Sequence, residues 1–323
     1  MKSLEKVLVT GGLGLIGSHL VQRLLKQGSQ VLVVDNQSTG TIRNLDHVVN
    51  KEKLSIQVVD VLDSEYMVKL LSNVDFCFHL AASLGVKRIL ASPIESYETN
   101  VHGTQSILEA ASKNSVPIFL ASTSEIYGDN PEQPLREDSK RVLGSPLKIR
   151  WSYAEAKALD ESLAQMYAIE KELKFIVGRF FNTVGPRQIG DYGMVLPRFV
   201  KAALQGDDLE VYGNGDQKRV FCHVDDAVEA ILQLVRDEAS FGEAFNIGGE
   251  GEISISELAQ TVTRVLGSQS KIKYVPYEQA YIDGFEETFR RVPDTSKLRA
   301  LTGWKPIKKL EETIRDIAQA MKI

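Results

Sequence analysis

The feature that most constrains the fold is a glycine-rich turn near the start of the chain. Residues 6–17 read KVLVTGGLGLIG, so a short β-type run leads directly into Gly11, Gly14 and Gly17. The residues that follow, Gly14–Gln27, have the apolar spacing of an amphipathic helix. Spaced glycines between a strand and a helix leave backbone N–H groups open to an anion and allow close approach of a pyrophosphate. The pattern predicts a dinucleotide-binding turn. The residues expected nearest the dinucleotide are Gly11, Gly14, Leu15, Ile16 and Gly17.

The second predicted strand, Gln30–Asp35, ends in an acidic residue. The Asp35 carboxylate can accept hydrogen bonds from both ribose hydroxyls and would repel a 2′-phosphate, so the sequence favours NAD over NADP. Asp60 closes the run Ser55–Asp60 and is expected either to bind the adenine edge or to cap the next helix. Asn36 and Val61, which follow these two acids, complete this part of the predicted cofactor site.

The first half of the chain alternates β-type runs with helix-type segments. The predicted strands are Lys6–Thr10, Gln30–Asp35, Ser55–Asp60, Val74–Leu80, Pro117–Ser122 and Leu173–Phe180. The predicted helices are Gly14–Gln27, Ser64–Leu71, Pro93–Lys113 and Tyr153–Glu172. Continuous apolar character is typical of parallel strands that are buried on both faces. The alternation predicts an α/β fold with a Rossmann-type doubly wound parallel sheet.

Glycine and proline interrupt this pattern after Asn182, which indicates a smaller mixed α/β domain. Its expected helices are Leu196–Gln205, Val224–Glu238, Ser256–Leu266 and Leu310–Met321. We therefore expect a dinucleotide-binding domain over residues 1–180 and a mainly substrate-binding domain over residues 181–323. Segments near residues 218–249 are expected to return to the large sheet, so that the two domains share a cleft.

Composition excludes several classes of protein. The chain has 323 residues, 43% of them hydrophobic, and a net charge of −5. It has no apolar run long enough to span a membrane and no basic excess that would attract nucleic acid. Cys77 and Cys222 form no disulfide or metal pattern, which suits a reducing cytoplasm. The apolar stretch Val7–Leu20 is broken by glycines and is taken as part of the fold, not as a signal peptide.

A tyrosine and a lysine lie four residues apart in the predicted helix after residue 151. Tyr153 and Lys157 would share one helix face, where an ammonium beside the phenol would lower the tyrosine pKa from about 10. Tyr153 could then act as a general base. The segment Ser122-Thr123-Ser124-Glu125 lies just past a predicted strand, at the sheet edge where open α/β sheets hold ligands, and a hydroxyl there can share the proton. His79 ends another strand, and we expect it to be a packed histidine.

Several motifs in this order resemble the extended short-chain dehydrogenases/reductases, the family of nucleotide-sugar epimerases, dehydratases and decarboxylases. Its cofactor motifs are matched by TGGLGLIG at 10–17, HLAA at 79–82 and ETN at 98–100. Its catalytic motifs are matched by STSEIYG at 122–128 and YAEAK at 153–157. Its substrate-side motifs are matched by RFFNTVGPR at 179–187, VYGNGDQKRVFCHVDD at 211–226, FNIGG at 245–249 and RRVPDTSK at 290–297.

The resemblance implies a cycle on a nucleotide-activated hexose, with a UDP-sugar placed first. Tyr153 would remove the C4 hydroxyl proton while NAD takes the C4 hydride, and Thr123 would assist. Lys157 would hold the nicotinamide ribose, and NAD would stay tightly bound and be regenerated in each cycle. The further residues that the resemblance assigns to the cofactor are Leu80, Ala81, Ala82, Asn100 and Ser122, together with Tyr153 and Lys157.

On the substrate side, the resemblance assigns the diphosphate to Asn182, Arg219 and Arg291, because guanidinium groups bind phosphate oxygens bidentately. It assigns the nucleotide base to Tyr212 and to Val195 and Leu196. No metal site is expected.

The 4-keto sugar leads to three outcomes, and Glu125 distinguishes them. Simple 4-epimerases usually lack an acid there, whereas decarboxylases and dehydratases carry one. Ser124 stands where dehydratases often have a first acid, which weakens that outcome. We place the 4-epimerase first, a UDP-glucuronate decarboxylase close behind, and a dehydratase third. A dehydrogenase that releases NADH and a nucleotide-binding protein without turnover are the remaining alternatives.

Two predicted helices, Pro93–Lys113 and Tyr153–Glu172, carry apolar residues on more than one face. One face should pack on the sheet, and by family resemblance the other forms a four-helix homodimer interface. On this interpretation, Leu163→Glu is expected to give monomers.

Overall fold

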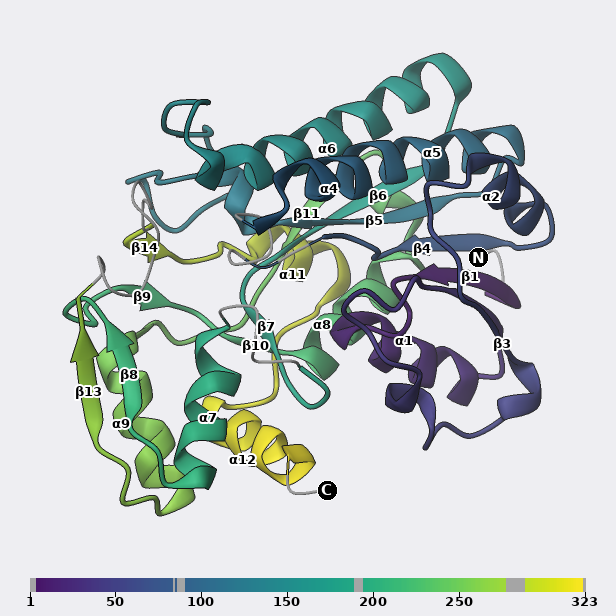
Figure 1. Ribbon diagram of the computed structural model, residues 1–323. Coiled ribbons are helices and arrows are strands. Elements are labelled where there is room, and N and C mark those ends of the chain that lie inside the picture. Colours follow the sequence, from purple (N-terminus) through teal and green to yellow (C-terminus); the bar gives the residue numbers. More distant parts are fainter. Residues whose placement is uncertain (1–3, 84, 86–90, 189–193, 277–287, 322–323) are drawn as a thin grey trace.

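The computed structural model describes residues 4–83, 85, 91–188, 194–276 and 288–321. Its centre is a sheet of seven strands (Figure 1). They are β1 (Lys6–Thr10), β2 (Gln30–Val34), β3 (Leu54–Gln57), β4 (Phe76–His79), β5 (Ile118–Thr123), β6 (Phe175–Phe180) and β11 (Ala244–Ile247). The order is β11-β6-β5-β4-β1-β2-β3, and every neighbouring pair is parallel. The predicted Rossmann-type fold class is confirmed.

Helices cover both faces of the sheet because each buries an apolar stripe against it. One face is covered by α1 (Leu15–Lys26), α8 (Val224–Leu234) and α11 (Ser296–Thr302). The other is covered by α2 (Ser64–Leu71), α5 (Gly103–Lys113) and α6 (Ser152–Lys171). In Figure 1, α2, α5 and α6 lie above the sheet, while α1 and α8 lie below it.

The segment predicted as one helix over Pro93–Lys113 is built differently. It begins as α4 (Pro93–Tyr97), widens into a π-helical turn at Glu98–His102 and continues as α5. The π turn carries Asn100, whose amide accepts a hydrogen bond from Ser83 N at 2.9 Å and donates to Ser83 O at 3.0 Å. Such turns are rare and occur often at functional sites; this one ties the helix to the chain that follows β4.

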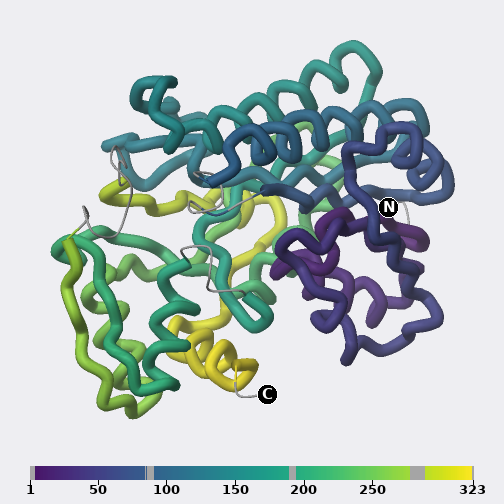
Figure 2. Tube along the Cα trace, in the orientation of Figure 1, coloured from purple at the N-terminus to yellow at the C-terminus, as the bar shows by residue number. Residues whose placement is uncertain are grey.

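The smaller domain has its own apolar core beside a two-stranded parallel sheet. Its elements are α7 (Val195–Gln205), β8 (Leu209–Tyr212), α9 (Ile255–Leu266), β13 (Ile272–Val275) and α12 (Leu310–Met321). Helix α9 begins at a capping box between Ser254 and Glu257 and ends at Gly267, whose positive φ terminates it. Figure 2 shows the chain leaving the sheet after β6 and returning to it with α8 and β11.

Short strands join the two parts. β7 (Thr183–Val184) pairs with β10 (Cys222–His223), and β9 (Lys218–Arg219) lies between β12 (Ile253–Ser254) and β14 (Arg290–Arg291). These pairings bring the 182–184 and 290–291 segments back toward the large sheet.

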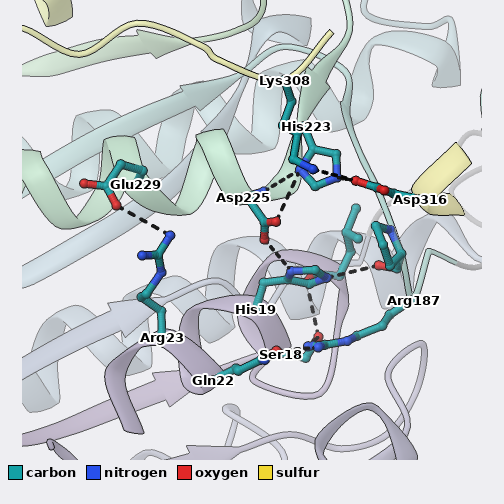
Figure 3. Close-up of polar contacts among 12 residues, drawn as sticks. Ser18, His19, Gln22, Arg23, Arg187, His223, Asp225, Glu229, Lys308 and Asp316 are labelled. Atoms are coloured by element: carbon teal, nitrogen blue, oxygen red, sulfur yellow. Dashed lines mark hydrogen bonds and ion pairs between the residues drawn. The ribbon is translucent and has the colours of Figure 1, made fainter. Parts of the chain in front are cut away.

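Polar contacts also fasten α1 to α8 and α12 (Figure 3). His19 Nδ1 lies 2.9 Å from Asp225 Oδ1, and its Nε2 lies 3.2 Å from the Pro186 carbonyl. On the far side of Asp225, His223 faces Asp316, which Lys308 binds at 2.8 Å. The helix that follows the glycine turn is thereby held against the smaller domain.

Candidate active site

A cavity of about 460 Å³ lies at the carboxyl ends of β1, β4, β5 and β6, where the smaller domain faces the sheet. This edge includes the point between β1 and β4 at which the strand order reverses, where open α/β sheets bind ligands. Predicted site residues that line it are Gly11, Gly14, Leu15, Ile16, Gly17, Asp35, Asn36, Val61, Leu80, Ala81, Ala82, Ser122, Thr123, Glu125, Tyr153, Asn182, Val195, Leu196, Tyr212, Arg219 and Arg291. Asp60, Asn100 and Lys157 are not among the residues that line it.

The glycine turn forms a cradle that side chains would fill. A Cβ on Gly11, whose φ is +66°, would lie 2.7 Å from Ala81 N, and a Cβ on Gly17 would lie 2.1 Å from Gly11 O. Gly14 caps α1 without a side-chain hydrogen bond, and the first turn of α1 holds no acidic residue. The free N–H groups and the dipole at the N-terminus of α1 therefore have no competing carboxylate in the first turn, which suits the pyrophosphate of a dinucleotide.

Asp35 is fixed at the cavity edge by the backbone. Its Oδ2 accepts from Leu13 N at 3.0 Å and its Oδ1 accepts from Gln37 N at 2.7 Å. Burial raises the pKa of Asp35, and these two hydrogen bonds oppose the rise. Each carboxylate oxygen keeps acceptor capacity for a ribose hydroxyl, so the side chain fits the role that the sequence assigns to it.

Asp60 lies beside this region but contacts the protein itself. Its Oδ2 accepts from Asn36 Nδ2 at 2.8 Å and its Oδ1 accepts from Leu62 N at 3.0 Å. The alternative expectation, that Asp60 caps the next helix, is wrong, because Asp63 caps α2 by accepting from Tyr66 N at 3.1 Å.

His79 is packed, as expected. Its Nδ1 lies 2.7 Å from Thr10 Oγ1 and its Nε2 lies 3.2 Å from Thr104 Oγ1. Burial, assisted by the charge of Lys157, lowers the pKa of His79 to about 3, so the ring is neutral.

Tyr153 and Thr123 both line the cavity. Thr123 ends β5, and its hydroxyl accepts from Glu125 N at 3.2 Å. Burial raises the pKa of Tyr153, and the negative charges of Glu125 and Asp160 raise it further. The predicted lowering by Lys157 is therefore wrong for this arrangement. The reason is that the Lys157 ammonium lies 2.7 Å from the Asp160 carboxylate, which offsets its charge.

Glu125 is held between two arginines. Arg291 Nη1 lies 2.5 Å from its Oε1, and Arg150 Nη2 lies 2.7 Å from its Oε2. Burial opposes ionisation of Glu125, but the two guanidinium groups outweigh it and lower its pKa to about 2. The sequence assigns Arg291 to the diphosphate, but its guanidinium instead contacts Glu125 and, at 3.3 Å, Ser124 Oγ.

Sequence reasoning missed three further arginines that line the cavity: Arg150, Arg187 and Arg198. Arg150 precedes Tyr153 by three residues, and this spacing is the sequence signal that could have placed Arg150 near the site. Arg198 lies over the ring of Tyr212 at 4.1 Å, on the side assigned to the base. Of the residues assigned to the diphosphate, Asn182 donates to Val220 O at 2.8 Å and Arg219 to Thr288 O at 2.8 Å.

Within the described ranges, no group of three or more His, Cys, Asp or Glu residues is placed to hold a metal ion. None of the helices described is long and apolar enough to cross a membrane.

The glycine cradle makes a direct prediction. Gly17→Ala places a Cβ against Gly11 O. We therefore expect its free energy of unfolding, measured by urea denaturation, to fall by about 3 kcal/mol or more. Gly206→Ala is the matched control, because its added Cβ meets nothing within 4 Å and its positive φ of +77° alone costs about 1 kcal/mol. Equal losses for the two variants would contradict the close approach.

The chain matches known proteins over nearly its whole length. The family model described as GDP-mannose 4,6 dehydratase matches residues 8–317. A UDP-N-acetyl-alpha-D-glucosaminuronate decarboxylase of Bacillus cytotoxicus is 44% identical over 98% of this chain and 97% of its own length. UDP-glucuronic acid decarboxylase 1 of Danio rerio is 35% identical over 98% of this chain and 73% of its own length.

Among solved structures, a UDP-glucuronic acid 4-epimerase from Bacillus cereus, in complex with UDP-glucuronic acid and NAD, superposes with a TM-score of 0.88. It is 27% identical, and the match covers 98% of this chain and 99% of that one. The expectations of an enzyme and of NAD as its cofactor are confirmed at the level of the family. The chain belongs to the extended short-chain dehydrogenase/reductase family of NAD-dependent nucleotide-sugar epimerases, dehydratases and decarboxylases.

Proposed function

We propose that the chain is an NAD-dependent decarboxylase of a UDP-hexuronic acid, with UDP-N-acetylglucosaminuronic acid as the first candidate substrate. The proposal reverses the order in which the sequence placed epimerase and decarboxylase. The observation that carries it is the pair of buried guanidinium groups that contact Glu125 at the cavity wall.

The cluster places two guanidinium groups in a poorly hydrated part of the cavity wall. Arg150 and Arg291 are 6% and 7% exposed, and both contact Glu125, which is 19% exposed. Lys157 and Asp160 form a separate pair. A guanidinium group has five N–H donors, so Glu125 does not exhaust the hydrogen-bonding capacity of either arginine. The carboxylate of a hexuronic acid can accept such charge-assisted hydrogen bonds, whereas the hydroxymethyl group of a neutral hexose cannot.

The residues of the cavity then account for the reaction. The ionised form of Tyr153, which its raised pKa makes the minor form, accepts the proton of the C4 hydroxyl, and the Thr123 hydroxyl shares that proton. The chemistry that bound NAD supplies is reversible hydride transfer at C4. Once C4 is a ketone, the carboxylate is β to a carbonyl and leaves as carbon dioxide, while its bonding electrons pass to the C4 oxygen. Tyr153 stabilises that oxygen as a hydrogen-bond donor, and C5 takes up one proton.

Glu125 has a positioning role in this scheme. With a pKa of about 2 it has no proton to give near neutral pH, so it does not serve as a general acid. Its charge orients the two guanidinium groups and keeps them from holding the substrate carboxylate too strongly to leave. Binding that is stronger in the ground state than in the transition state slows a reaction.

The relatives support the proposal. The protein that is 44% identical is named for decarboxylation of UDP-N-acetyl-alpha-D-glucosaminuronate, and the one that is 35% identical for decarboxylation of UDP-glucuronic acid. A hexuronate 4-epimerase is the second candidate. It is favoured by the TM-score of 0.88 to a 4-epimerase solved with UDP-glucuronic acid, since both reactions need the same C4 oxidation.

The test is mass spectrometry of products from the purified chain with UDP-N-acetylglucosaminuronate, UDP-glucuronate, UDP-glucose and UDP-N-acetylglucosamine, without added NAD. The proposal expects loss of carbon dioxide from a hexuronate. An unchanged mass with altered chromatographic retention would instead establish a 4-epimerase. Loss of water would establish a dehydratase.

Glu125→Gln leaves two guanidinium charges without their carboxylate. We expect the kcat for carbon dioxide release to fall about 100-fold, with KM unchanged or lower, because the substrate carboxylate is held more strongly. Steady-state kinetics measure both constants, and Glu132→Gln, at an exposed position, is the control. A Glu125→Gln enzyme with full kcat would remove this role.

The predicted homodimer also has a more exact test. Leu163 packs against a buried cluster, so Leu163→Glu would disturb folding as well as assembly. Met166 and Ile169 on the same helix are 53% and 73% exposed, and Ile94 of α4 is 74% exposed. We propose that this apolar face forms the interface between two copies.

The cytoplasmic location remains a prediction.

We expect Met166→Glu/Ile169→Glu to sediment as a monomer with an unchanged unfolding midpoint, because the face would carry charges at an apolar contact. Leu147→Glu is the control, since Leu147 is 92% exposed and lies outside helices α4 and α6. A double variant that keeps the assembly state of the unaltered chain would contradict the interface.

A further inference from the structure

Lys157 shares its burial with a second charged group. Asp160 is fully buried, Lys157 is 2% exposed, and Asp160 Oδ2 lies 2.7 Å from Lys157 Nζ. Tyr153, Lys157 and Asp160 are spaced four and three residues apart, so they share one face of α6. Two charges removed from water in this way persist only because each compensates the other.

A directed series of hydrogen bonds connects this pair to the cofactor turn. Thr10 Oγ1 accepts from the backbone N–H groups of residues 80 and 81, so its own proton goes to His79 Nδ1. The neutral ring then carries its proton on Nε2 and donates it to Thr104 Oγ1 at 3.2 Å. The Thr104 hydroxyl in turn interacts with the Asp160 carboxylate. Every donor in the series points toward Asp160, as does the ammonium of Lys157.

We propose that Asp160 is a positioning residue that fixes the ammonium of Lys157 in the protein interior and sets the pH range in which Tyr153 works as the base. The Lys157 ammonium has three N–H donors. Asp160 occupies one of them and leaves the other two, which the family motif assigns to the hydroxyls of a nicotinamide ribose, although Lys157 does not itself line the cavity. This inference rests on the proposed role of Tyr153.

The electrostatic surroundings support the inference. Asp160 and Glu125 both raise the pKa of Tyr153. The groups that face the Tyr153–Asp160 stretch are Glu161 of α6, His79 of β4 and Glu125 after β5, itself held by its two arginines. Helix α5 contributes the Thr104 hydroxyl. Removing the Asp160 charge would let Lys157 act on Tyr153 without compensation, and the pKa of Tyr153 would fall.

Asp160→Asn tests this with little change of shape. We expect the acidic limb of the kcat–pH profile to move to lower pH by about one unit, because one opposing charge is removed. We also expect less NAD to copurify with the variant, measured by absorbance after denaturation. Glu170→Gln is the matched control, an exposed carboxylate on the same helix, and should leave both readings unchanged.

A folded Asp160→Asn chain with the unaltered pH profile and the unaltered NAD content would overturn the inference. If this variant does not fold, the double variant Lys157→Gln/Asp160→Asn decides the matter. Recovery of folded protein supports the counter-ion role, and failure to recover contradicts it.

A further reading is independent of turnover. Ultraviolet titration of tyrosine ionisation, taken as the difference from Tyr153→Phe, should give a lower midpoint in Asp160→Asn. If the unaltered chain turns over no UDP-sugar, the proposed function fails. The titration still decides whether Asp160 controls Tyr153.

Discussion

The close backbone approach at the glycine turn is the constraint on which the remaining site depends. Gly11 lies against the chain after β4, and Gly17 lies against Gly11 itself. A Cβ added at either glycine would lie closer to its neighbour than side chains tolerate. This contact fixes the start of α1 at the point where the strand order reverses. It also places the helix N-terminus, Asp35 and the carboxyl ends of β4 and β5 around one cavity. Catalytic groups on β5 and α6 can be positioned only relative to a cofactor held there.

Two groups of charged side chains lie near Tyr153, and they differ in charge and in place. The Lys157–Asp160 pair is neutral as a unit and lies in the protein interior beneath Tyr153. The cluster of Glu125 with Arg150 and Arg291 places two guanidinium groups at the cavity wall. A site for a neutral sugar has no need of the second arrangement. A site for a sugar acid does, and the carboxylate of Glu125 limits how strongly that acid is held.

The sequence was sufficient to predict those parts of the fold whose geometry is set by residues close together in the chain. The strand–turn–helix of β1 and α1, with Asp35 at the end of β2, could be predicted because its geometry is set by neighbouring residues. Other features depend on distant parts of the chain. Arg291 reaches Glu125 across a separation of 166 residues. The π turn at Glu98–His102 and the burial of Asp160 also follow from tertiary packing. The sequence predicts a lowered pKa for Tyr153 because local spacing shows Lys157 but not the burial or the charges of Glu125 and Asp160, which raise that pKa.

The measurement that tests the central claim most directly is calorimetric titration of the Tyr153→Phe chain, which binds without turnover, with UDP-N-acetylglucosaminuronate and with UDP-N-acetylglucosamine. The two ligands differ in the carboxylate that the Glu125 cluster is proposed to receive. The account predicts that the hexuronate binds at least about tenfold more tightly, equivalent to about 1.4 kcal/mol. Equal affinity, or tighter binding of the neutral sugar, would contradict a site built for a sugar acid.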